Sequence, residues 1–151
     1  MPESSPPSWG NYPESDASVH KLSHRKEDLP QCPGSVLAYG LGRSYGDSCL
    51  NNGEHLLLTR GLDHWISLDE ERGLLECEAG VSLDEILKLI TPSGWFLPVT
   101  PGTRFVTLGG AIANDVHGKN HHQAGSFGAF VQEFEVLHSD GSREICSRTQ
   151  H

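Results

Sequence analysis

Short apolar runs separated by turn-forming residues dominate the hydrophobic pattern of this chain, and such runs predict β-strands. The first four predicted strands are Ser35–Tyr39, Glu54–Thr59, His64–Leu68 and Leu74–Ala79. The last two flank the polar segment Asp69–Gly73, which is typical of a tight turn. We therefore expect these two strands to be neighbours.

Another strand is predicted over Phe127–His138, because its middle portion, Glu133-Phe134-Glu135-Val136, alternates acidic and apolar residues. The dipeptide Asp140-Gly141 that follows is a strong signal for a hairpin turn. We expect the chain to return through this turn as a strand over Arg143–Cys146.

One helix is predicted from both its cap and its apolar face. Ser82 and Glu85 have the spacing of a capping box, and apolar residues at 83, 86, 87 and 90 recur on one side of a helix. The helix should stop by Pro92, with Gly94 just beyond it.

Two further helices are weaker predictions. Thr107 is a suitable N-cap for a helix over roughly 108–115. The segment 19–31 is expected to form a short helix that ends before Pro30. Because strands do not alternate with long helices, the pattern indicates a mixed α+β fold and not a regular doubly wound one.

The length of 151 residues is enough for one domain with a core. Residues 1–18, rich in Pro, Ser and acidic side chains, are expected to form a flexible lead-in, and residues 19–151 to form the domain. The chain ends just after the predicted hairpin, so we expect it to be a piece of a longer protein, incomplete at its C-terminus.

Composition excludes several classes of protein. The net charge of −9 argues against binding of nucleic acid by bulk attraction. No apolar run approaches the roughly 20 residues of a membrane span. The four cysteines form no CxxC pair, so they suggest neither a zinc site nor a disulfide framework, and reduced thiols in a cytoplasmic protein are expected.

The densest chemistry lies in Thr100–Gly128. Gly109 and Gly110 stand at the start of the helix predicted there, where each costs about 1 kcal/mol relative to Ala. One interpretation is that free N–H groups and the positive end of the helix dipole approach a phosphate. The alternative is a small-residue helix packed tightly on a neighbour.

A second glycine-rich segment, Gly40–Asp47, follows a predicted strand. Its spacing, G-x-G-x-x-x-G, departs from the dinucleotide fingerprint of Rossmann folds, and no helical periodicity follows it, so we reject that fold. Successive free N–H groups in such a loop, with Arg43 beside them, suit a pyrophosphate. An ordinary surface turn is the alternative.

His117, His121 and His122 cluster in the sequence, with Lys119 between them. A metal site is one interpretation, although Gly118 argues against a continuous helix that would chelate zinc. Lining of a substrate pocket is a second, and surface or core histidines are a third. A serine hydrolase is excluded, since no G-x-S-x-G elbow is present.

Three phrases, GLGRSYGD, PGTRFVTLGGAIANDVHGKNHH and AGSFG, closely resemble the flavin-binding domain of the vanillyl-alcohol-oxidase / p-cresol-methylhydroxylase (PCMH) family. SWGNYP near the start fits the opening of the same family. The nearest branch is that of the decaprenylphosphoryl-β-D-ribose 2-oxidases and their FAD-dependent relatives. The resemblance covers roughly residues 9–146, and runs of this length are specific.

The resemblance implies a PCMH-type FAD-binding domain of two small α+β subdomains, with FAD between them and no Rossmann fold. It implies no metal. The residues that it implies for cofactor binding lie in the two glycine-rich segments or directly beside them: Ala38, Tyr39, Gly40, Leu41, Gly42, Arg43, Ser44, Tyr45, Gly46, Asp47, Ser48, Gly102, Thr103, Thr107, Leu108, Gly109, Gly110, Asn114, Asp115, Val116 and His117.

The resemblance further implies that His117 and Lys119 face the substrate side of the flavin. Many relatives attach FAD to a histidine in a Gly-Gly-His-Ser loop, but Arg43 stands at the matching position here, so noncovalent FAD is expected. Chains of this family are longer, and the substrate domain, with an active-site lysine and cysteine, is expected to be absent from this sequence.

The function implied for the whole protein is that of an FAD-dependent oxidoreductase, which oxidises a CH–OH group of a sugar-like or polyprenyl-phosphate-sugar substrate by hydride transfer to flavin. A reductase or epimerase is an implied partner protein, and this chain alone is expected to be inactive. The alternative is a nucleotide-binding fragment with no turnover of its own.

Overall fold

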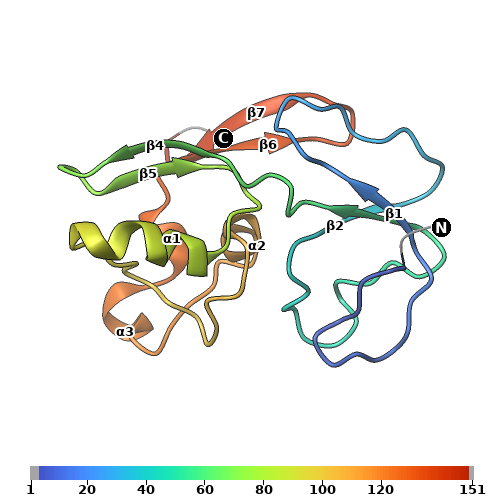
Figure 1. Ribbon diagram of the computed structural model, residues 1–151, viewed down its shortest axis with the longest axis horizontal. Coiled ribbons are helices and arrows are strands. Elements are labelled where there is room, and N and C mark those ends of the chain that lie inside the picture. The colour runs from blue at the N-terminus through green and yellow to red at the C-terminus, as the bar shows by residue number, and fades with distance from the viewer. Residues whose placement is uncertain (1–3, 150–151) are drawn as a thin grey trace.

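The computed structural model describes residues 4–149 and divides the chain into two lobes, each with its own buried cluster (Figure 1). No helix among these residues is long and apolar enough to cross a membrane. In chain order, the elements are β1 (Ser18–Lys21), β2 (Val36–Tyr39), β3 (His55–Leu58), β4 (Trp65–Asp69), β5 (Leu74–Cys77), α1 (Leu83–Ile90), η1 (Thr91–Ser93), α2 (Leu108–Ala113), α3 (His121–Ala124), η2 (Phe127–Phe130), β6 (Glu133–Leu137) and β7 (Arg143–Ser147).

The first lobe is a parallel sheet in the order β1-β3-β2. Leu56 of the central strand is fully buried between its partners and belongs to a cluster with Tyr39 and Cys49. The helix predicted over 19–31 is wrong, because Ser18–Lys21 pairs with β3 instead. A weak local helix preference is overridden there by backbone pairing with a distant strand.

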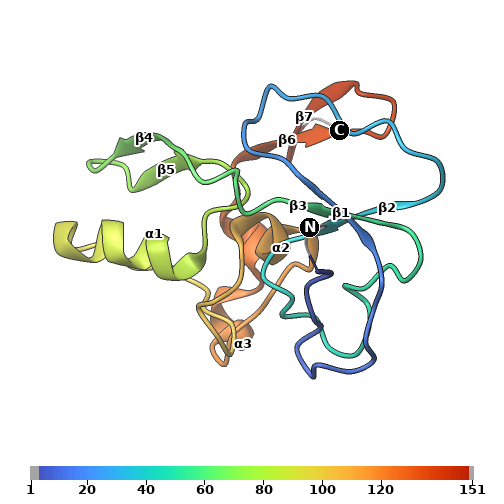
Figure 2. The ribbon, with the colours of Figure 1, turned by 45° about the vertical axis from the view of Figure 1, so that its right-hand side comes forward.

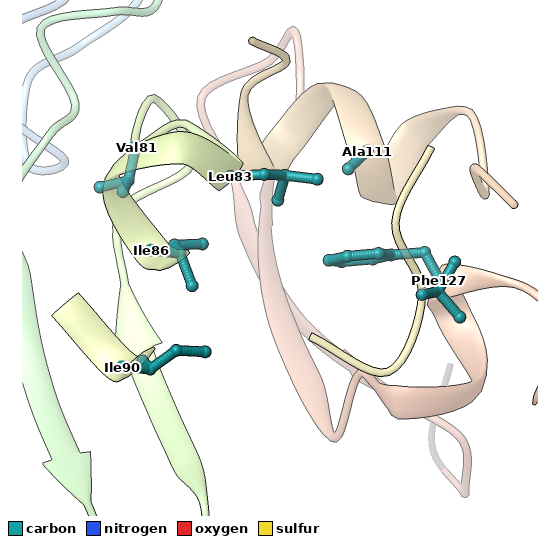
Figure 3. Packing of buried hydrophobic residues seen from close by; sticks show 7 residues of the cluster. Val81, Leu83, Ile86, Ile90, Ala111 and Phe127 are labelled. Carbon is teal, nitrogen blue, oxygen red and sulfur yellow. The ribbon is translucent and has the colours of Figure 1, made fainter. Parts of the chain in front are cut away.

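The second lobe holds the larger core, which lies between the β4–β5 hairpin, α1 and α2 (Figure 1). Leu83, Ile86 and Ile90 of α1 point toward Ala111 of α2 and Phe127 of η2, as Figure 3 shows. The predicted pairing of the two strands is confirmed, with an irregular register between Trp65 and Ser67. The predicted α+β class is therefore confirmed, as three small sheets with short helices.

The predicted ends of α1 are confirmed. The Ser82 hydroxyl accepts from Glu85 N at 3.2 Å, and Glu85 Oε2 accepts from Ser82 N at 2.7 Å. Arg60 donates to both carboxylate oxygens of Glu85, each at 3.1 Å. Beyond η1, Gly94 closes the turn with a left-handed φ of 83°.

The strand predicted over Phe127–His138 is confirmed only in its second part. Phe127 is 7% exposed and begins η2, because its ring fills the core of the second lobe. Strand β6 starts at Glu133 and pairs with β7 through the predicted hairpin. Arg143 of β7 also donates to Glu27 O at 3.3 Å, which ties the hairpin to the first lobe.

Leu83→Ala is expected to lower the free energy of unfolding by about 3 kcal/mol, because it empties a fully buried site in the larger core. Leu89→Ala lies on the same helix but at a position 36% exposed, so it should cost less than about 1 kcal/mol. Urea denaturation of both variants measures the difference. Equal losses would contradict the assignment of the buried face of α1.

Glu85→Gln is expected to cost about 1 kcal/mol at pH 7, a figure reduced for the partial exposure of the ion pair. Hydrogen bonds from Arg60 lower the pKa of the Glu85 carboxyl from 4.5 to about 2. Because this pKa is lower in the folded than in the unfolded protein, the ionised carboxylate stabilises the fold at pH values above about 4.5. This contribution is lost as the pH falls from about 4.5 toward 2. The difference between wild type and variant in urea denaturation should therefore shrink over that window.

The matched control is Glu71→Gln, since the Glu71 carboxylate makes no hydrogen bond or ion pair within the described part of the chain. It should change neither the stability at pH 7 nor its dependence on pH. A difference between wild type and Glu85→Gln that stays constant from pH 7 to pH 3 would contradict the role of the ion pair.

Candidate functional site

The segment Gly40–Asp47 leaves β2 as an irregular loop without a helix, as expected once a Rossmann fold is rejected. Gly42 is buried with a φ of 61°, and a Cβ there would overlap the Tyr39 hydroxyl. That hydroxyl donates to Pro7 O at 2.7 Å, and burial raises the pKa of the Tyr39 phenol, so it stays a neutral donor. The loop is thus wrapped around a fixed tyrosine.

Unused hydrogen-bond donors gather in this loop. The backbone N–H groups of residues 41–46 have no acceptor in the part of the chain that the structure describes. Arg43 donates from Nη1 to Leu41 O at 2.8 Å, but its Nε is buried without a partner. The Arg43 guanidinium also lies 4.8 Å from the centre of the Trp9 ring. An orphaned buried N–H beside free backbone donors fits an anionic group such as a pyrophosphate.

Sequence reasoning did not place Trp9 in the site. The aromatic ring holds the Arg43 guanidinium by a cation–π contact, and with the Leu41 carbonyl it fixes the direction of the side chain. The clue that the sequence offered to a role of Trp9 was its aromatic side chain, in a segment that is otherwise rich in Pro, Ser and acidic residues. Trp9 lies within the predicted lead-in, whose flexibility stays a prediction.

The two glycine-rich segments lie side by side. A Cβ at Gly40 would stand 2.6 Å from Thr107 Oγ1, so only glycine allows the loop this close to the start of α2. Figures 1 and 2 both show the loop after β2 descending beside α2. Thr107 is buried, and its hydroxyl accepts from Gly110 N at 3.1 Å as the predicted N-cap.

The expectation that α2 offers free N–H groups to a phosphate is wrong. Leu108 N donates to Val81 O at 2.7 Å, and Gly109 N donates to Ala79 O at 2.8 Å. The approach at Gly109 is also tight, because a Cβ there would lie 3.0 Å from that of Ala79, closer than most Cβ contacts in proteins. The alternative of tight packing on a neighbour therefore holds at the start of α2.

The turn after α2 uses its polar side chains internally. Asn114 Nδ2 donates to Gly110 O at 2.8 Å. Asp115 has a positive φ of 40° and accepts from Gly128 N at 2.7 Å. A hydrogen bond from Ser126, followed by that from Gly128, lowers the pKa of Asp115. These bonds, with Val116 packed against the core, position the next residue, His117, at the surface.

An open hollow of about 670 Å³ lies beyond this turn. His117, Lys119 and Gly102 all line it, so the structure brings together the predicted substrate-side residues and one residue predicted to lie near the flavin. The Lys119 ammonium makes no ion pair within the described residues. The hollow has space and a free positive charge, which suits a polar or anionic ligand.

The nitrogens of the three clustered histidines are not arranged as a set of metal ligands in this structure. The rings of His117 and His121 are 5.5 Å apart and those of His121 and His122 are 3.8 Å apart. The three nevertheless do not bring one nitrogen each within 4.8 Å of one another. His121 Nδ1 lies 3.1 Å from Gly118 O, so one ring is tied to the backbone.

The other predicted cofactor residues are spread along both segments. Tyr45 is 88% exposed, and Ser48 donates to its carbonyl at 3.0 Å. Thr103 Oγ1 accepts from Phe105 N at 3.1 Å. The remaining residues predicted to bind the cofactor are partly or fully exposed: Ala38, Leu41, Ser44, Gly46, Asp47 and Leu108. Their contacts with FAD stay predictions.

Comparisons with known proteins show the family to which the chain belongs. The model of a family described as "FAD binding domain" matches residues 23–147. Over 106 residues, 70% of this chain, the sequence is 50% identical to decaprenylphosphoryl-beta-D-ribose oxidase of Mycolicibacterium smegmatis. Over 136 residues, 86% of this chain, it is 28% identical to "Probable D-2-hydroxyglutarate dehydrogenase, mitochondrial" of Oryza sativa subsp. indica.

A solved structure of alkyldihydroxyacetonephosphate synthase matches the fold with a TM-score of 0.71 and 14% identity, over 91% of this chain and 28% of that one. The chain covers 23% of the length of each of the two sequence relatives above. The family model, in contrast, spans most of this chain. The chain therefore belongs to the FAD binding domain family, with the PCMH-type fold.

Proposed function

We propose that this chain binds FAD noncovalently and contributes to an FAD-dependent oxidoreductase that oxidises a CH–OH group of a sugar-like substrate. The observation that carries the proposal is the loop after β2, where the N–H groups of residues 41–46 and Arg43 Nε lack acceptors among the described residues. A pyrophosphate supplies oxygen acceptors for such donors. The sugar-like substrate is supported by 50% identity to an oxidase of decaprenylphosphoryl-ribose.

Noncovalent attachment is supported by the chemistry of the loop. Between Ala38 and Ser48 there is no histidine, and Arg43 occupies the position where many relatives carry one. A guanidinium remains protonated in proteins and is not a nucleophile at neutral pH. Arg43 would instead hold the pyrophosphate by charge-assisted hydrogen bonds.

The substrate side is proposed to be the hollow lined by His117 and Lys119. When bound, FAD supplies the acceptor of the hydride, and the protein supplies orientation and electrostatics. The Lys119 ammonium would raise the electron affinity of the cofactor or orient the substrate. His117 would position a substrate hydroxyl or a water, since an imidazole is both donor and acceptor.

The chain covers only part of its relatives, so turnover is proposed for the whole protein and binding for this chain. A reductase or epimerase is the proposed partner protein. The four cysteines are free, which supports a reducing compartment such as the cytoplasm. The second candidate function is nucleotide binding without turnover. It is favoured because the chain covers only part of the length of its relatives.

Arg43→Gln is expected to weaken FAD binding by the chain roughly 10- to 100-fold, because a hydrogen bond to a charged group contributes about 1.5–3 kcal/mol. Titration with FAD, followed by the change in flavin fluorescence, measures the affinity. ADP should compete with FAD and riboflavin should not, since the loop is proposed to hold the pyrophosphate.

Arg72→Gln is the matched control, because Arg72 lies in the exposed β4–β5 turn far along the chain from the loop. It should leave the affinity unchanged. Equal affinities of wild type and Arg43→Gln would contradict the pyrophosphate site. Acid precipitation of the complex should release all the flavin, and flavin that stays with the precipitated chain would contradict noncovalent binding.

Lys119→Gln is expected to lower the reduction potential of FAD bound to the chain, because it removes a positive charge that favours the electron-rich form. Reduction in equilibrium with a reference dye measures the potential. Lys26→Gln, which removes an equal charge from an exposed loop of the first lobe, should leave the potential unchanged. An unchanged potential in Lys119→Gln would show that the ammonium does not face the flavin.

A further inference from the structure

Three potential metal ligands from outside both glycine-rich segments meet on the first lobe. His20 lies on β1, His55 on β3, and Cys32 in the loop that leads to β2. One ligand atom from each lies within 4.8 Å of the other two, and all three side chains are partly buried. The residues are widely spaced in the sequence, which explains why motif spacing did not reveal them.

The hydrogen bonds of His55 prepare it as a ligand. Its Nε2 lies 2.9 Å from Pro33 O, and a carbonyl only accepts, so in the neutral ring Nε2 carries the proton. The lone pair of His55 Nδ1 then faces His20 Nε2 at 3.0 Å. A backbone carbonyl on the second ring nitrogen is the usual arrangement of a metal-binding histidine.

The loop that supplies the carbonyl is itself fixed. Gly34 follows Pro33 with a φ of 89°, and the Glu54 carboxylate fills the space where a side chain would stand. Glu54 Oε2 accepts from Ser35 N at 3.0 Å. Because Glu54 immediately precedes His55, the ligand and its carbonyl partner are held by one short stretch of backbone.

The geometry points to a zinc site formed by His20 Nε2, Cys32 Sγ and His55 Nδ1, with a fourth position open to water. Tetrahedral zinc with these donors has ligand atoms about 3.3–3.6 Å apart, so the present cluster needs shifts of about 1 Å or less. Two imidazoles and one thiolate suit zinc better than magnesium or calcium, which prefer oxygen.

The protons of all three ligands can be accounted for when zinc binds. Cys32 Sγ now donates to Pro30 O at 3.7 Å, and its thiol proton leaves to solvent when the sulfur binds zinc. The proton of His20 Nε2 moves to Nδ1 of the same ring, so both imidazoles stay neutral. One proton is released for each zinc bound, and the affinity should therefore rise with pH.

Titration of the chain with Co²⁺ tests the site, because Co²⁺ takes the place of zinc and gives a charge-transfer band only with thiolate ligands. We expect such a band, saturating at about one Co²⁺ per chain and removed by added Zn²⁺. Cys32→Ser should abolish it, and Cys146→Ser should keep it. Absence of the band in the wild type, or its persistence in Cys32→Ser, would overturn the proposal.

His20→Gln is a second variant, which retains the thiol. It should weaken Zn²⁺ binding by more than about tenfold, since even partners of a metal ligand contribute that much. Zn²⁺ should also raise the Tm of the wild type and of Cys146→Ser but not that of Cys32→Ser. Unchanged affinity in His20→Gln would exclude the imidazole as a ligand and overturn the site.

Discussion

The close approach of Gly40 to Thr107 is the constraint on which the rest of the structure depends. It is the point where the loop after β2 meets the N-cap of α2, and a side chain at Gly40 would force them apart. Thr107 also forms an isolated bridge with Ser82, the N-cap of α1. One buried threonine therefore joins the first lobe to both longer helices of the second.

This joint decides which backbone groups are left for a ligand. The first N–H groups of α2 are consumed by Val81 O and Ala79 O, because the helix start is pressed against the segment before α1. The N–H groups of residues 41–46 have no such neighbour among the described residues. The donors for an anion thus come from an irregular loop, and the glycines of α2 serve its packing.

Local signals were enough to predict α1, because its capping box and apolar face lie within one short segment. They failed for 19–31, where the strand forms only through pairing of Ser18–Lys21 with the distant β3. They also failed at Phe127, whose place in the core depends on α1 and α2. The sequence indicated free N–H groups both in the loop after β2 and at the start of α2, but those of Leu108 and Gly109 donate to neighbouring carbonyls. Which donors stay unused is decided by tertiary packing, and local signals do not show it.

The loop between β1 and β2 links the two proposed sites physically. Arg25 N donates to Glu78 Oε1 at 3.2 Å, and Glu27 O accepts from Arg143, so the loop is tied to the second lobe at two points. The same loop carries Cys32 and then runs into β2. Cys32 therefore lies just ahead of the strand that leads into the loop holding Arg43.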